Sequence, residues 1–532
     1  MIENGFVRKY TDTFTDTNSL FVDREEETAL FLKTIRAELK TKYLEFVGVS
    51  GQGKTELLKW INRKSRKEGY LTAYIDFSQN QFQRPEIYPI LQEIADQIRH
   101  EIETGESSAP FQSFQDILPK YLEVLREFYK DSWLSDSVDS KPYIDLEENL
   151  TKAFRKDFGE LIKSNTVVLC LDSTEQTYKR AFREFEYKIL SYFTNDSNFM
   201  LVSSGQTPIK WEDKTFPPEA RGSVRSSLLK PLDKKSAVRQ IESIAKHEGR
   251  SLSKPHEIGD KLFEITLGHP LSNFQLVEYW LSETEKDKPQ VSPELVEEQL
   301  NGGIRELAKR FIEKQIFRSV YIDPNIYPSP VEILRCLSPL RFIEFGILWF
   351  ALKTFLPTWF AGKPFSHTER LFKSLTTSFV FSSVQFGTGY MMEPVVRNIL
   401  LQDLKRNYNK NYRLIQEQIT KRYDFYVHES HDDSRIKFFV EHFYHLACTL
   451  SLEEAKNINN KLKEVLDKFL KRTFMMDGLV NPEMAIQQLF DLENKLEQEK
   501  RGPFSIANLG TNVDIEDIVK KVKRFRMRMR TG

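Results

Sequence analysis

Tyr43-Leu-Glu-Phe-Val-Gly-Val-Ser-Gly-Gln-Gly-Lys-Thr-Glu-Leu-Leu-Lys-Trp-Ile61 dictates how the first part of this chain must fold. Residues 44–47 are mostly apolar and predict a buried strand. Residues 48–55 match the pattern G-x-x-x-x-G-K-[ST], and residues 56–61 have the apolar spacing of a helix. A strand, a glycine-rich loop and a helix in this order predict a phosphate-binding P-loop.

The residue types in this loop suit a nucleoside triphosphate with Mg²⁺. Glycines let the backbone curl so that its N–H groups converge on phosphate oxygens, and the positive end of the next helix adds to that field. Lys54 would place its charge on the β- and γ-phosphates, and the Thr55 hydroxyl would be a ligand of Mg²⁺. The predicted nucleotide-binding residues are Gly48, Val49, Ser50, Gly51, Gln52, Gly53, Lys54 and Thr55.

A second buried strand carries the predicted carboxylates. Residues 166–172 are apolar up to Asp172, and Glu175 follows one short turn later. Ligands bind at the carboxyl ends of strands in open α/β sheets, so Asp172 would hold Mg²⁺, usually through water. Glu175 would orient or deprotonate the attacking water. The predicted catalytic residues are therefore Glu175, Lys54 and Asp172. The alternative is a helix N-cap at Asp172 with Glu175 completing a capping box; the nearby P-loop favours the metal site.

The next two strands carry weaker signals. Residues 199–203 form a strand whose exit either places Ser204 or Gln206 near the γ-phosphate or simply leaves the sheet. Residues 228–232 are the expected last strand. Arg221 and Arg225 precede it and either meet phosphate, in their own chain or a neighbour's, or stay solvated. The absence of an Asn-Lys-x-Asp guanine-reading pattern favours adenine, and hence ATP.

The bulk composition limits the classes of function. A chain of 532 residues is too long for one core, and its 77 basic and 77 acidic residues give no net charge to attract nucleic acid or membrane. Three widely spaced cysteines form neither a disulfide framework nor a zinc site. The most apolar stretch, Phe342–Leu356, contains Glu344 and Lys353 and is too short to span a bilayer. We therefore expect a cytoplasmic protein without a membrane span.

Helical periodicity and turn residues divide the chain after the P-loop region. A short helix and small hairpin near residues 371–392 predict a winged helix. The expected fold class is an α/β P-loop NTPase domain, with a parallel sheet between helices, followed by a helical subdomain, the winged helix and an all-α C-terminal region. The predicted segments are a lead-in (1–20), the P-loop domain (21–232) with a helical insertion (104–163), a helical lid (233–320), a winged-helix-like domain (321–404), an all-α domain (405–500) and a basic tail (501–532).

The basic tail has an alternating pattern. Phe525, Met527 and Met529 alternate with arginines within Lys520–Arg530, and a period of two predicts an edge strand. Contact with nucleic acid or acidic lipid is one interpretation; a tail that folds back on the protein or stays solvated is favoured.

Several of these landmarks occur in the order found in STAND-type signalling ATPases, relatives of the NB-ARC and AAA+ proteins. Phe-Val-Asp-Arg-Glu-Glu-Glu at 21–27 resembles the entry motif before their P-loop. Residues 229–232 are similar to their L-x-x-L segment, and Gly268-His-Pro-Leu to a G-x-P turn. Met392-Glu-Pro-Val-Val-Arg397 resembles a winged-helix motif, although Glu393 stands where the family has histidine, and Ser204-Gly205-Gln206 replaces a sensor arginine.

The resemblance covers about residues 20–400 and implies a switch. Pro270 would touch the nucleotide from the helical lid, and ATP binding, hydrolysis and ADP release would control conformation or homo-oligomerisation. The helical C-terminal region would receive an unknown protein partner. Two alternatives stay open: an AAA+-like loader or motor on nucleic acid, with the basic tail as its handle, and a scaffold that binds ATP structurally.

Overall fold

A computed structural model gives the fold. It describes residues 23–36, 38, 42–102, 110–132, 141–193, 196–211, 224–283, 290–311, 322–376, 380–383, 389–430, 434–452, 457–476, 482–500, 505–506 and 513–531. The chain divides into two compact units: unit 1 comprises residues 1–260 and 268–277, and unit 2 comprises residues 261–267 and 278–532.

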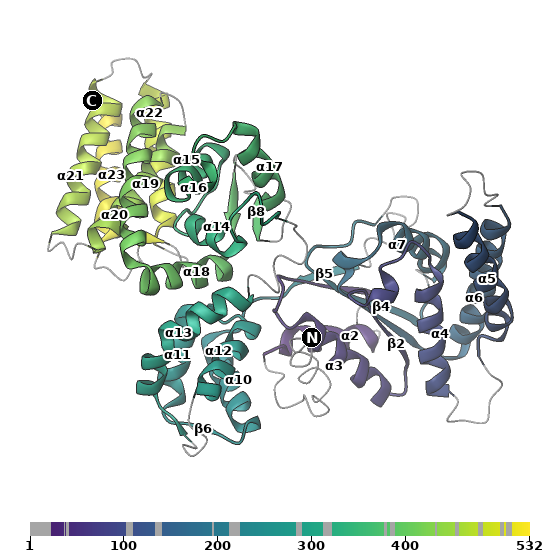
Figure 1. Cartoon of the computed structure of the whole chain (residues 1–532). Coiled ribbons are helices and arrows are strands. Elements are labelled where there is room, and N and C mark those ends of the chain that lie inside the picture. The colour runs from purple at the N-terminus through teal and green to yellow at the C-terminus, as the bar shows by residue number, and fades with distance from the viewer. Residues whose placement is uncertain are drawn as a thin grey trace. The chain divides into compact units, whose positions relative to one another are not determined.

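Unit 1 is built on a parallel sheet of five strands, in the order β2-β3-β4-β1-β5; Figure 1 labels β2, β4 and β5 of this sheet. The strands are β1 (Tyr43–Val47), β2 (Leu71–Asp76), β3 (Val167–Asp172), β4 (Phe199–Gly205) and β5 (Val224–Leu228). Val47 pairs with Gly205 on one side and Leu228 on the other, and Asp76 pairs with Asp172. The residues that follow these strands therefore gather at one edge of the sheet.

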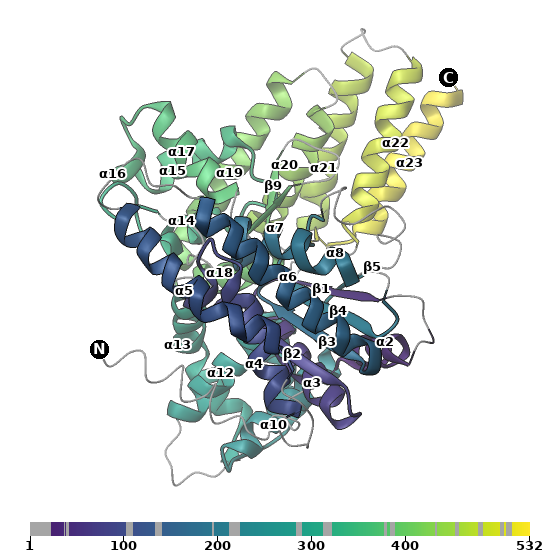
Figure 2. The same ribbon diagram turned by 90° about the vertical axis from the view of Figure 1, so that its right-hand side faces the viewer.

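Helices cover both faces of this sheet, as a parallel sheet requires. Val168 and Cys170 pack with the apolar face of α3, whereas Val167, Leu169 and Leu171 face a second cluster on the opposite side. Figure 2 shows α5 and α6 side by side within that second layer. The helices of unit 1 are α2 (Glu25–Ile35), α3 (Lys54–Lys67), α4 (Tyr88–Ile102), α5 (Gln112–Ser132), α6 (Lys141–Ser164), α7 (Lys179–Phe185), α8 (Ser191–Phe193) and α10 (Lys234–His247). The predicted parallel sheet between helices is confirmed.

Unit 2 is mostly helical. Its elements are β7 (Gln290–Val291), α13 (Pro293–Phe311), α14 (Pro330–Leu337), α15 (Phe345–Phe355), α16 (Pro357–Phe360), α17 (Phe365–Thr376), β8 (Phe381–Ser383), β9 (Tyr390–Met392), α18 (Pro394–Asn407), α19 (Asn409–Glu429), α20 (Ser434–Leu452), α21 (Ile458–Lys471), a π-helical turn (Arg472–Met476), α22 (Pro482–Gln498) and α23 (Ile515–Thr531). The strands β8 and β9 pair antiparallel. Glu393 caps α18 by accepting a hydrogen bond from the Val396 N–H at 2.8 Å. Two helices, α11 (Pro255–Thr266) and α12 (Pro270–Glu283), continue from one unit into the other.

The predicted edge strand in the basic tail is wrong, because this segment forms the helix α23. Ile515, Ile518, Val519 and Val522 are buried at helical spacing and pack into the core of the C-terminal helices. This apolar stripe precedes the alternating arginines and outweighs their period of two. The arginines that alternate with Phe525, Met527 and Met529 fit into a helix as well, because their long aliphatic stems can pack on the helix while the charged ends stay in water.

The last strand of the sheet begins before the predicted residues 228–232. β5 ends at Leu228, and the Leu229 N–H donates to the Val47 carbonyl at 2.8 Å. Pro231 has no N–H with which to continue a ladder. Arg225 therefore lies within the edge strand and is exposed, whereas Arg221 lies outside the described residues.

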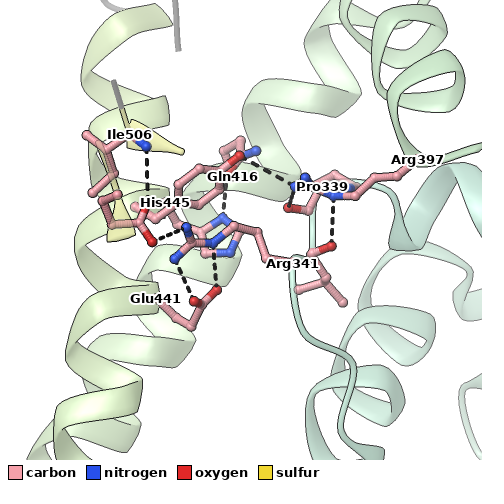
Figure 3. A network of polar contacts seen from close by, with 10 residues as sticks. Pro339, Arg341, Arg397, Gln416, Glu441, His445 and Ile506 are labelled. Carbon is pink, nitrogen blue, oxygen red and sulfur yellow. Dashed lines mark hydrogen bonds and ion pairs between the residues drawn. The ribbon is translucent and has the colours of Figure 1, made fainter. Parts of the chain in front are cut away.

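A buried ion network holds the loop between α14 and α15 within unit 2 (Figure 3). Arg341 donates to Glu441 Oε1 at 2.6 Å and to Glu499 Oε1 at 2.5 Å. Arg397 donates to the carbonyls of Ser338, Pro339 and Leu340. Arg341 therefore neutralises two carboxylates that have almost no access to solvent.

Replacing Arg341 with methionine should destabilise unit 2. Glu441 and Glu499 would stay buried without a counter-charge, at a cost of about 3–5 kcal/mol. Urea unfolding of the full chain measures the loss. Lys373→Met is the control because Lys373 pairs with Glu369 on the surface, and it should change stability by about 0.5 kcal/mol or less. Equal effects of the two variants would contradict the structural role of the network.

No helix among the described residues has both the length and the apolar character needed to cross a membrane.

Cys170, Cys336 and Cys448 are buried free thiols.

Candidate functional site

The loop between β1 and α3 has the backbone geometry of a phosphate cradle. Gly51 and Gly53 have φ values of +83° and +86°, a region that side-chain-bearing residues rarely adopt. Gly53 occupies the N-cap position of α3, so the N–H groups of the first helical turn open onto the loop. The Lys54 ammonium lies over this loop and donates to the carbonyls of Gly48 and Val49 at 2.8 and 2.9 Å.

Two carboxylates lie at the same edge of the sheet: Asp172 is the last residue of β3, and Glu175 follows it. Asp172 is 1% exposed, accepts a hydrogen bond from the Tyr74 hydroxyl at 2.7 Å and accepts another from the Ser204 hydroxyl. Glu175 Oε2 accepts from the Gln206 N–H at 3.0 Å. Burial lowers the pKa of Lys54, while the charges of Glu175 and Asp172 oppose that shift. The lysine and both carboxylates therefore share one electrostatic environment.

The capping-box interpretation of Asp172 and Glu175 does not hold. Ser173 occupies the N-cap position of the short helix Thr174–Gln176, with a φ of +57°. The Glu175 carboxylate reaches across to β4 and bonds to Gln206, so no reciprocal cap is formed.

The exit of β4 is part of the site. Ser204 and the Gln206 backbone bond to Asp172 and Glu175, respectively. A β-carbon on Gly205 would meet Thr174 Oγ1 at 2.3 Å and Glu175 Oε2 at 3.2 Å. Gly205 thus allows the chain after β3 to lie directly against the end of β4. Residues 204–206 therefore contact both carboxylates, and the placement of Ser204 or Gln206 near a γ-phosphate stays a prediction.

His269, whose role the sequence did not indicate, packs against the P-loop. Its Nε2 lies 2.7 Å from the Ser50 carbonyl, and its Nδ1 lies 2.8 Å from Ser272 Oγ and 3.2 Å from the Ser272 N–H. A carbonyl only accepts and a backbone N–H only donates, so the proton is on Nε2 and the imidazole is neutral. Burial lowers the pKa of His269 to about 4.

The turn around Pro270 is held close to the P-loop. The Leu271 N–H donates to the Gly51 carbonyl at 3.2 Å, and the Pro270 carbonyl accepts from Gln240 Nε2 at 3.2 Å. A β-carbon on Gly51 would lie 2.5 Å from His269 Cε1 and 2.8 Å from Leu271 Cβ. The start of α12 therefore contacts the loop through residues 269 and 271, on either side of Pro270.

Arg24 is a second residue that sequence reasoning missed. It is 6% exposed, and it donates to the Gln52 carbonyl at 2.8 Å and to the Lys230 carbonyl at 3.1 Å. This side chain ties the segment before α2 to the P-loop. Arg24 stood in the quoted entry motif, but nothing in its local pattern indicated which atoms it binds.

The oxygen groups present suit Mg²⁺ that is shared with phosphate. Thr55 is the second residue of α3, and Asp172 offers a fixed carboxylate. Within the described residues, no group of three or more His, Cys, Asp or Glu side chains could hold a metal by itself. Mg²⁺ in nucleotide sites typically uses one or two protein ligands plus phosphate and water, and this donor set matches that requirement.

Comparisons with known proteins identify no family. No protein-family model matches the chain, and no curated protein matches it. Among solved structures, a RuvB variant from Thermotoga maritima is 10% identical, covering 70% of this chain and 93% of that chain with a TM-score of 0.32. DnaA from Aquifex aeolicus with AMPPCP bound is 13% identical, covering 69% and 94% with a TM-score of 0.32. Likeness at this level carries no functional argument, and the assignment of a P-loop α/β fold rests on the sheet and loop themselves.

Alanine at Gly51 should be more harmful than alanine at Gly53. Both glycines have positive φ, which costs an alanine about 1–2 kcal/mol, but a β-carbon at Gly53 meets nothing within 4 Å. At Gly51 the clash with His269 and Leu271 adds a further cost of about 1–3 kcal/mol. Urea unfolding without nucleotide compares the two variants, and His269→Ala should narrow the gap. Equal losses would mean that the turn at 269–271 does not contact the loop.

The neutral state of His269 predicts a pH dependence of stability. Its pKa falls from the ordinary 6.5 to about 4 in the folded protein, so between these values the unfolded chain binds more protons. Stability is then fully present at pH 7 and falls as the pH drops from about 6.5 to about 4, by up to about 3 kcal/mol. Unfolding free energies measured across this range should show the loss in the wild type. In His269→Gln, the unfolding free energy should lack this loss between pH 6.5 and 4. If wild type and variant lose the same unfolding free energy over this range, the neutral state of His269 is contradicted.

Proposed function

We propose that this chain binds Mg-ATP and hydrolyses it slowly, and that its nucleotide state switches conformation or self-association as in STAND-class ATPases. The observation that supports this best is the grouping of Lys54, Asp172 and Glu175 at the sheet edge where the glycine loop opens. A cation, a metal-ligating carboxylate and a second carboxylate are the groups that phosphoryl transfer to water requires.

Each residue has a defined task in this proposal. The N–H groups of residues 48–55 bind the phosphate oxygens, and the Lys54 ammonium turns from the Gly48 and Val49 carbonyls to the β- and γ-phosphates. Thr55 and Asp172 hold Mg²⁺, which neutralises charge on those phosphates. Glu175 orients the attacking water and accepts its proton. Pro270 contacts the nucleotide from the start of α12.

The regulatory part of the proposal draws on the elements after the sheet. Helix α17 with the hairpin β8–β9 supports a winged helix at 321–404, and α10 to α13 supply the helical lid. The α-helices from α19 onward would receive a protein partner, and homo-oligomerisation would follow nucleotide exchange. A switch of this kind shifts only by the difference in nucleotide affinity between its two states.

A second candidate function is an ATPase that acts on nucleic acid. It is favoured by Lys523 and Arg524, which are exposed on α23 and could contact phosphates. Asp467 and Glu493 neutralise Lys521 and Arg526 of the same helix, which reduces the basic surface. Stimulation of ATP hydrolysis by a DNA or RNA oligonucleotide would favour this candidate over the switch.

Lys54→Ala should lower the affinity for Mg-ATP by about two orders of magnitude, because the loop amides remain but the charge facing the phosphates is lost. Isothermal titration of ATP with Mg²⁺ into the purified chain measures the effect. Lys64→Ala on the same helix is the control, since Lys64 pairs with Glu68 at 2.6 Å and lies away from the loop. Unchanged ATP affinity in Lys54→Ala would refute the nucleotide site.

Glu175→Gln should keep ATP binding and slow hydrolysis by about 10²–10³-fold, the range for the loss of a general base. The amide oxygen can still accept the Gln206 N–H, so the fold of the site is retained. Phosphate release under saturating Mg-ATP measures turnover. Glu184→Gln, which removes a carboxylate paired with Lys188 at 2.7 Å, should turn over at the wild-type rate. Full activity in Glu175→Gln would reassign the base.

A further inference from the structure

A cavity of about 190 Å³ lies inside unit 2, between α15, α19, α20 and the residues before α15. Phe342, Ile347, Tyr423, Tyr426 and Phe438 form its apolar walls. The rings of Tyr426 and Phe438 have centroids 5.1 Å apart, and those of Tyr423 and Tyr426 are 6.2 Å apart. Pockets for drug-sized ligands start at about 300 Å³, so this cavity suits a smaller molecule with an apolar body.

Three charged side chains line the same cavity, and they differ in their solvent exposure and in their ion pairs. Glu441 is 3% exposed, and Arg341 engages both of its oxygens (Figure 3). Lys437 and Glu344 form an ion pair with each other and are 26% and 31% exposed. Only this partly exposed pair can turn toward a ligand without leaving a buried charge unpaired.

The ion pair restricts the charge of a ligand. A purely cationic molecule that bound Glu344 would compete with Lys437, and an anion that bound Lys437 would compete with Glu344. A zwitterion replaces one ion pair with two charge-assisted pairs, and its apolar side chain covers the aromatic walls. We propose that this cavity is a binding site for a free α-amino acid with an apolar side chain, its carboxylate on Lys437 and its ammonium on Glu344.

The Tyr423 hydroxyl adds a neutral donor to this site. Burial raises the pKa of Tyr423 well above its ordinary value, and the charges of Glu441 and Glu344 raise it further. The phenol therefore stays protonated at neutral pH, and in this proposal Tyr423, which lines the cavity, serves as a neutral donor to the ligand carboxylate. The inference stands on unit 2 alone and does not depend on nucleotide binding.

Matched ligands test the charge requirement. Isothermal titration of the full-length chain should detect L-phenylalanine and L-leucine. Phenethylamine and 3-phenylpropanoate each lack one charge of phenylalanine and should bind at least about tenfold more weakly, a difference of about 1.4 kcal/mol. Glycine lacks the apolar body and should also bind weakly. Equal binding of phenylalanine and its single-charge analogues, or no binding of either amino acid at about 10 mM, would overturn the proposal.

Variants test the position of the site. Lys437→Met and Glu344→Gln should each weaken L-phenylalanine binding at least about tenfold. A β-carbon on Gly346 would meet only Tyr426 Oη, at an ordinary 3.5 Å, so Gly346→Ala should bind normally while Gly346→Leu blocks the cavity. Lys373→Met, which removes an exposed paired lysine on α17, is the charge control, and circular dichroism checks folding. Lys54→Ala should bind L-phenylalanine normally, which separates this site from the nucleotide site. Wild-type affinity in both Lys437→Met and Gly346→Leu would refute the site.

Discussion

Three successive carbonyls of the P-loop each accept a hydrogen bond, two of them from the turn at 269–271 and the third from Arg24. The Ser50 carbonyl lies against His269 Nε2, the Gly51 carbonyl accepts from the Leu271 N–H, and the Gln52 carbonyl accepts from Arg24. Carbonyls and N–H groups project to opposite sides of a peptide unit, so holding the carbonyls outward presents the N–H groups to the inside of the loop. A phosphate cradle that is held open by outside donors needs less reorganisation when its ligand arrives.

This constraint explains why the segments around the loop have little freedom. A positively charged His269 would place a second proton toward the Ser272 N–H and another cation near Lys54, so the site requires the neutral imidazole. Gly51 must lack a β-carbon because His269 and Leu271 occupy that space. α12 begins at Pro270 between these two contacts, and therefore any change in the loop backbone is transmitted directly to the first turn of this helix.

The sequence predicts the parts of the site whose signals are local, and it misses those that depend on distant partners. The P-loop and the carboxylate after β3 follow from spacing within short stretches. His269 meets Ser50 from 219 positions away and Arg24 reaches Lys230 across 206, and no local pattern encodes such pairs. The sequence pattern predicts the last strand at residues 228–232, whereas β5 is Val224–Leu228. The difference arises because Val-Arg-Ser-Ser-Leu is an edge strand with little apolar alternation. In α23, the alternating arginines predict a strand, whereas the buried residues Ile515, Ile518, Val519 and Val522 have the spacing of a helix.

The carboxylate side of the site is held as tightly as the loop. Ser173 adopts a left-handed backbone conformation directly after Asp172, a strain of about 1–3 kcal/mol that only a well-determined environment maintains. That environment is the end of β4, where Ser204 fixes Asp172, Gly205 leaves room for Thr174, and the Gln206 N–H binds Glu175. Under the proposed function, Glu175 must leave or share this N–H to act on water. The Gln206 N–H at the end of β4 would then set the orientation of Glu175 as the base. Because β4 lies between β1 and β3, it would join the phosphate-binding part of the site to the part that activates water.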